Sequence, residues 1–193
     1  MMRRLPVLIL MAALAAGPAL AQPAATTTGP TMAGPAATPL PQDFYAPTDL
    51  YGYLAMAGAC DQFAVQSARL AMVRSHDESV LAFARSSRTA HEAWAAHRLA
   101  ESNRAGLHPP LPALTGDFQR RLDALARQSD ADFGAAYLTE MMRILDQTVA
   151  VQAAYAERGD NAILRDVARE SIALVGARRA EAQARLAGPP NGA

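Results

Sequence analysis

Apolar and small side chains recur every three or four residues over four long stretches of the chain, which is the spacing of one face of an α-helix. These stretches cover about residues 48–74, 77–105, 130–159 and 161–186. The positions expected to face inward are, in chain order, Leu54, Ala57, Ala64, Ala68 and Ala71, then Val80, Ala84, Ser87, His91 and Trp94, then Phe133, Tyr137, Met141, Ile144, Thr148, Val151 and Tyr155, and finally Ile163, Val167, Ile172, Leu174 and Val175. No segment alternates with the period of two that a strand requires, so the pattern predicts an all-α chain.

Helix caps and prolines set the boundaries of these stretches. Three of the four expected starts carry a short polar side chain that can accept a hydrogen bond from a free backbone N–H. The candidate caps are Thr48 or Asp49, Asp77 or Ser79, and Asp130 or Asp132. The prolines between Gly106 and Pro112 end the second stretch, and a shorter helix is expected from Thr115 to Gln128. The pattern therefore predicts a four-helix bundle, with a short extra helix in the connection between its second and third helices.

The amino-acid composition excludes several classes of function. Alanine, the strongest helix former, supplies 45 residues. All 18 basic residues are arginine and 18 acidic residues balance them, so no strong field attracts nucleic acid. The lack of lysine excludes Schiff-base and P-loop lysine chemistry. A single cysteine excludes an internal disulfide.

The first 21 residues have the layout of a secretory signal peptide. Arg3 and Arg4 precede an apolar stretch, and small residues around Ala21 predict cleavage there. A transmembrane helix is the alternative, but the apolar run is short for a bilayer and Gly17 and Pro18 interrupt it. We therefore expect a periplasmic or secreted protein that has no transmembrane span after cleavage.

The rest of the chain is expected to divide into three parts. Residues 22–47 contain six prolines among Ala, Thr and Gly, and are expected to be a disordered linker. Residues 48–187 are expected to form the helical bundle. Residues 188–193, which begin with Gly188-Pro189-Pro190, are expected to be a disordered tail.

Several stretches between about residues 50 and 185 resemble the DUF4142 family. They are Ser67–Ala71, Val80–Ala84 followed by His91, the loop from Leu107 to Pro112, and Asp132-Phe133 followed by Tyr137 and Met141. Members of this family are secreted bacterial proteins, labelled as outer membrane proteins, with a ferritin-like helical bundle. The resemblance therefore implies a ferritin-like fold. The family pattern has further histidines where this chain has Leu145 and Arg178, so His91 is the one family histidine that remains.

Helix geometry predicts one cluster of polar side chains inside the bundle. Asp61 and His91 each lie 15 residues from a turn near residue 76, so at 1.5 Å per residue they share a level about 22 Å from it. Glu140 and Arg178 each lie 19 residues from a turn near Gly159, at about 28 Å. We therefore expect a structural polar cluster of Asp61, His91, Glu140 and Arg178, held as two cross-helix pairs.

Three functions fit these features, and no catalytic residues are predicted. The first is a non-catalytic envelope protein without a cofactor, which acts by binding an envelope protein partner. The second is a metal-binding ferritin-like protein with His91, Glu140 and Asp61 as ligands, or with His91 and methionine sulfur as ligands for Cu(I). The third is a ligand carrier with a cavity along the small residues of the first helix. No Glu-x-x-His sequence is present, so a di-iron site is not expected. The sequence leaves the oligomeric state open.

Overall fold

The computed structural model describes residues 47–109 and 111–188, and it has five α-helices and no strand in those ranges. The helices are α1 (Leu50–Arg74), α2 (Glu78–Arg104), α3 (Gly116–Ala126), α4 (Asp130–Arg158) and α5 (Ala162–Ala187). The chain divides into residues 1–38 and 39–193, and all five helices belong to the second unit. The all-α prediction is confirmed. The predicted signal peptide, the linker before Pro47 and the tail after Gly188 lie outside the described residues.

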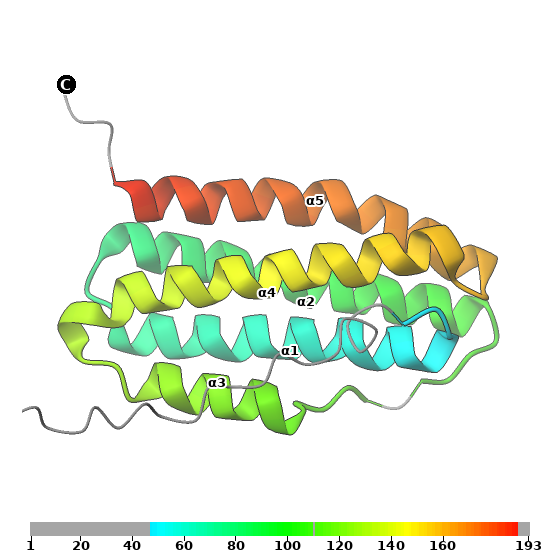
Figure 1. The fold of residues 1–193 in the computed structure, drawn as a ribbon, viewed down its shortest axis with the longest axis horizontal. Helices are drawn as coiled ribbons and strands as arrows, with labels where there is room; N and C mark the ends of the chain where they lie inside the picture. Colours follow the sequence, from blue (N-terminus) through cyan, green and yellow to red (C-terminus); the bar gives the residue numbers. More distant parts are fainter. Residues whose placement is uncertain (1–46, 110, 189–193) are drawn as a thin grey trace, which may run out of the picture. The chain divides into compact units, whose positions relative to one another are not determined.

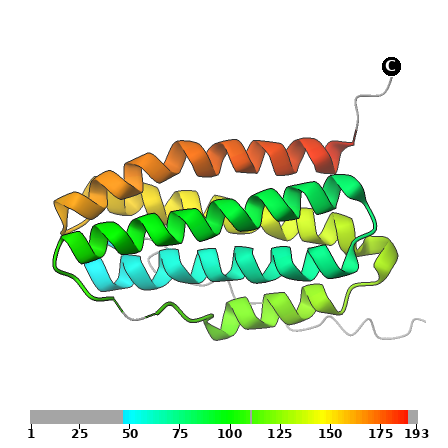
Figure 2. The ribbon, with the colours of Figure 1, turned by 180° about the vertical axis from the view of Figure 1, so that it is seen from behind.

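The four long helices run side by side, and each contacts two of the others (Figure 1). Helix α1 packs on α2 and α4, and α5 also packs on α2 and α4, so the core lies between all four. Helix α3 lies outside this group against α1, as both views show (Figure 2). No helix in the described ranges is both long enough and apolar enough to span a bilayer.

Side-chain caps fix where the long helices begin. Asp49 accepts a hydrogen bond from the Gly52 N–H at 2.7 Å, as predicted. The predicted cap of α4 is wrong, because Ser129 takes that role and accepts from the Asp132 N–H at 3.2 Å. Asp130 and Asp132 instead lie in the first turn of α4, where a carboxylate interacts favourably with the positive end of the helix dipole.

The core follows the predicted faces of α1 and α4 closely. Tyr53 of α1 and Tyr155 of α4 are fully buried and stack at a centroid distance of 4.0 Å. The prediction for α5 is partly wrong, because Ile163 and Leu174 are 43% and 54% exposed while Leu164 is fully buried. The buried face of α5 contains alanine and serine, so its large apolar residues alone do not reveal it.

The connection between α2 and α3 runs beside the N-terminal half of α1 (Figure 1). Gly106 begins this connection with φ of +75°, a conformation that an L side chain rarely adopts. Pro112 lies against Gly58 of α1, and a Cβ atom at Gly58 would overlap Pro112 Cβ and lie 3.0 Å from Cγ. The close approach of the connection therefore depends on the missing side chain at Gly58.

The substitution Gly58→Ala should lower the melting temperature, because the rigid Pro112 ring cannot move without displacing the connection. Gly176→Ala is the matched control, since nothing lies within 4 Å of a Cβ at that position of α5. The control should raise stability by about 0.5–1 kcal/mol through helix propensity. Thermal melts of the two variants measure this difference, and a stabilised Gly58→Ala variant would contradict the close contact.

Candidate functional site

A polar group of three residues lies in the core between α1 and α2. His91 and Asp61 approach with an Nδ1–Oδ1 distance of 2.8 Å, and both side chains are buried. The guanidinium of Arg98, also buried, bonds the second carboxylate oxygen, Oδ2, of Asp61. The predicted level pairing of Asp61 with His91 is therefore confirmed by the geometry. Arg98 was missed, although it lies seven residues after His91 and thus on the same face of α2.

The carboxylate of Asp61 stays ionised in this apolar setting because of its two neighbours. Burial opposes the charge, but Arg98 and the hydrogen bond from His91 outweigh it and hold the pKa of Asp61 below its usual range. Burial likewise opposes the charge of Arg98, and Asp61 outweighs this effect and raises the pKa of Arg98. An ionised carboxylate can only accept hydrogen bonds, so His91 must donate from Nδ1.

The other ring nitrogen of His91, Nε2, is enclosed and has no hydrogen-bond partner among the described residues. The Trp94 ring contacts the imidazole edge-on, with centroids 4.6 Å apart. Ser87 Oγ and Tyr137 Oη are also enclosed, and Ser87 interacts with the phenol of Tyr137. Burial raises the pKa of Tyr137 above its usual range, so the phenol stays protonated. Among the described residues, His91 Nε2 is thus an unsatisfied polar atom of the core.

The predicted pair of Glu140 and Arg178 is wrong. Glu140 faces α3, where its Oε2 accepts from Arg121 Nε at 3.0 Å and Nη2 at 2.9 Å. Its Oε1 accepts from Arg143 at 2.8 Å. Arg178 faces α2 instead and donates to Ser86 Oγ at 3.0 Å and to Glu181 at 2.5 Å. The three predicted metal ligands therefore do not converge.

The turn between α4 and α5 covers residues 159–161, as predicted, but the side chains of the two helices do not pair level about Gly159. Arg179 bonds Asp146, and Arg169 donates to the Ala156 carbonyl at 3.0 Å. The midpoint of both pairs lies near residue 162, whereas the prediction placed the turn at Gly159. This difference shifts α5 by about seven residues, or about 10 Å along the axis. In the described ranges no three His, Cys, Asp or Glu side chains are placed to hold a metal ion.

The thiol and phenol groups next to Asp61 are protonated and unreactive at neutral pH. Cys60 is fully buried, and its burial raises the pKa of the thiol to about 12. Burial also raises the pKa of Tyr53 to about 12, and its phenol donates to Gln152 Oε1 at 2.8 Å. The thiol and the phenol thus remain protonated at neutral pH and offer no nucleophile.

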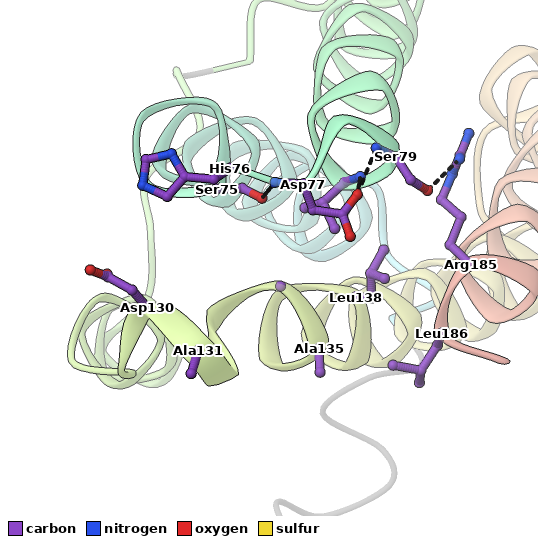
Figure 3. Close-up of a pocket in the computed structure, with 12 residues that line it drawn as sticks. Ser75, His76, Asp77, Ser79, Asp130, Ala131, Ala135, Leu138, Arg185 and Leu186 are labelled. Atoms are coloured by element: carbon purple, nitrogen blue, oxygen red, sulfur yellow. Dashed lines mark hydrogen bonds between the residues drawn. The ribbon is translucent and has the colours of Figure 1, made fainter. Parts of the chain in front are cut away.

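A polar pocket of about 330 Å³ lies at the end of the bundle where α1 turns into α2 (Figure 3). Its polar groups serve the helix ends. Asp77 caps α2 by accepting from the Ser79 N–H at 2.7 Å, and Arg185 of α5 donates to Ser79 Oγ at 3.0 Å. The His76 ring points away from Asp77 and Arg185 (Figure 3). The polar side chains of this pocket therefore cap α2 and link α2 to α5, and they do not form a cluster of reactive groups.

An apolar groove of about 650 Å³ opens between the start of α1 and the connection from α2 to α3. Among the residues that line it are Tyr51, Leu54, Met56, Pro109, Leu111 and Pro112. Leu111 is 88% exposed and Tyr51 is 63% exposed. A second, smaller apolar pocket of about 200 Å³ shares Leu54, Pro109 and Leu111 with this groove and reaches Arg98. The sequence did not predict this surface, because it depends on where the connection lies.

Comparison with known proteins identifies a family and a fold. The family model described as "Domain of unknown function (DUF4142)" matches residues 36–184, which confirms the resemblance seen in the sequence. A crystal structure of a DUF305 fragment from Deinococcus radiodurans is similar with a TM-score of 0.61 and 15% identity, over 70% of this chain and 93% of that chain. At this identity the likeness concerns the helical fold alone. The search of curated proteins finds no match.

The substitution Asp61→Ala should lower the free energy of unfolding by about 3–5 kcal/mol, because it leaves the charge of Arg98 buried without a partner. Asp146→Ala, which breaks the solvent-exposed pair with Arg179, is the control and should cost less than about 1 kcal/mol. Adding Arg98→Met to Asp61→Ala should recover part of the loss, because the double variant buries no charge.

The same measurements have a predicted pH dependence. The folded-state pKa of Asp61 lies below its unfolded value of about 3.9, so its stabilising effect is complete above that pH and is lost as the pH falls below it. Denaturant melts below pH 4 should therefore show a steeper loss for the native chain than for Asp61→Ala. Parallel curves for the two proteins would contradict an ionised, buried Asp61.

Proposed function

The chain belongs to the DUF4142 family, and we propose that it is a non-catalytic, ferritin-like helical-bundle protein of the periplasm that acts by binding another protein. One observation carries this proposal. Both oxygens of Asp61 and both oxygens of Glu140 are bound by neighbouring cationic or imidazole groups of the same chain. The acidic residues that would serve a catalytic or metal site are thus engaged in holding helices together.

A catalytic site needs an acid, base or nucleophile that can reach a substrate. Asp61, His91 and Arg98 are buried within the bundle. The Cys60 thiol is buried as well, and its pKa of about 12 keeps it from acting as a thiolate. This burial supports a structural role for the polar core of the protein.

The open surface supports binding. The groove beside α1 has mostly apolar walls, and it exposes Leu111 and Tyr51 to solvent. Contiguous exposed apolar surface of this kind marks interaction sites in soluble domains. An apolar stretch of polypeptide is an occupant that these mostly apolar walls can receive.

The periplasmic location rests on the sequence of the first 21 residues, with their basic start, apolar stretch and small residues before Gln22. The ferritin-like arrangement rests on the four long helices, which each contact two others, and on the crossover connection that carries α3.

Metal binding is the second candidate function, and the Nε2 atom of His91, which is unpartnered among the described residues, favours it. A histidine that donates from Nδ1 to a carboxylate is the usual arrangement of a metal-ligating imidazole. Here the carboxylate of Asp61 is also bound by Arg98, which already supplies positive charge at this site. This arrangement weakens the case for a cation beside His91.

Metal content and metal-dependent melting separate the two functions. We expect protein purified without chelator to carry no stoichiometric metal. We also expect Zn²⁺, Fe²⁺ or Cu⁺ to leave its melting temperature unchanged, because a ligand stabilises only a folded state that binds it. The matched variant is His91→Asn, whose amide nitrogen can still donate to Asp61 but which lacks the Nε2 atom. A bound metal that the native chain holds and His91→Asn loses would overturn the proposal in favour of metal binding.

A further inference from the structure

We propose that the apolar groove beside α1 is covered at rest by the chain's own residues 40–46, with Phe44 and Tyr45 seated against Leu111. This inference deepens the proposed binding function, on which it rests, because it names the occupant that a partner would have to displace.

The composition of the segment before α1 points to this role. Phe44 and Tyr45 are the only aromatic residues outside the described ranges, and they stand just before Pro47. The residues from 22 to 39 are mainly Pro, Ala, Thr and Gly, a composition that buries little surface and suits a spacer. Two adjacent aromatic side chains carry a large apolar surface that a spacer does not need.

The path of the chain brings these residues to the groove. Pro47 and Asp49 line the groove themselves, so the segment ends at its edge. Phe44 is three residues before Pro47, and an extended chain spans up to about 10 Å over that distance. Met56, on the groove wall, lies six residues beyond the start of α1, or about 9 Å along the helix. The aromatic pair can therefore reach the length of the groove that α1 lines.

The family boundary gives an independent reason. The DUF4142 match begins at residue 36, 11 residues before Pro47, although the first helix begins only at Leu50. The family pattern thus includes the stretch that contains Leu40, Phe44 and Tyr45. A stretch that belongs to the domain pattern and precedes its first helix has a place in the domain, and the adjacent apolar groove is the surface that can receive it.

Tethering favours this occupant over a second copy of the chain. A segment joined directly to the groove edge meets it at an effective concentration of about millimolar, well above that of a free partner. A partner must therefore compete with residues 40–46, so the segment acts as a built-in competitor that raises the affinity a partner needs. A weakly binding apolar ligand would therefore fail to occupy the groove, whereas a partner of higher affinity could bind there.

The test measures how fast a maleimide labels a single introduced thiol in the full chain. Leu111→Cys places the thiol in the groove, while Val73→Cys places one on the exposed surface of α1 near its C-terminal end, where Val73 is 82% exposed. The native Cys60 is fully buried and stays silent. Each thiol is then measured in three backgrounds: the native segment, Phe44→Ser with Tyr45→Ser, and Met32→Ser, which changes an apolar residue outside the family match.

We expect the serine pair at 44 and 45 to speed labelling at position 111 by about 5- to 10-fold, since a docked segment lowers the exposure of the groove. Met32→Ser should leave the labelling rate at position 111 unchanged. The labelling rate at position 73 should be the same in all three backgrounds. Equal rates at position 111 in all backgrounds would overturn the inference and leave the binding proposal standing. Protection at position 111 that grows with protein concentration would identify a second copy as the occupant and would overturn it as well.

A second measurement does not depend on labelling rates. Phe44→Cys combined with Leu111→Cys should form a disulfide within one chain under mild oxidation, because the two side chains are expected to lie in contact. Met32→Cys with Leu111→Cys is the matched control and should cross-link much more slowly. Similar rates of cross-linking for the two pairs would contradict docking of residues 40–46.

Discussion

A carboxylate can be buried in a helical bundle only when other groups compensate its charge, and the core of this protein is arranged around that constraint. Asp61 of α1 is compensated by His91 and Arg98, which lie two helical turns apart on one face of α2. The three side chains join α1 to α2 at one register, because a sliding of either helix would leave a charge without its partner.

The accuracy of the predicted polar pairs depended on the geometry of the turn between each pair of helices. Asp61 and His91 were correctly predicted to lie at the same height in the bundle. Only three residues separate α1 from α2, and the residues of the two helices pair symmetrically about the middle of this break. The turn between α4 and α5 has Gly159, Asp160 and Asn161 outside the helices, yet the helices pair about a point near residue 162. Counting residues from the turn cannot detect that offset, because it depends on how the side chains of α5 pack against α4.

Other features were hidden because they depend on contacts between distant segments. Glu140 meets Arg121 because α3 packs outside the bundle, and a helical pattern alone does not say on which side an extra helix lies. The groove exists because Pro112 approaches the bare backbone of Gly58, which places the connection beside α1. The all-α class, the family and the inward faces of α1 and α4 could be predicted, since periodicity and local pattern determine them.

We propose that the buried polar group is structural, with an ionised Asp61 and an imidazole whose Nε2 atom has no partner among the described residues. The most direct test is the ¹⁵N NMR spectrum of the His91 ring at neutral pH, recorded before and after addition of Zn²⁺. We expect a protonated Nδ1, with the signals of both ring nitrogens unchanged by the metal. A proton on Nε2 with none on Nδ1, or an Nε2 signal that moves when Zn²⁺ is added, would contradict it.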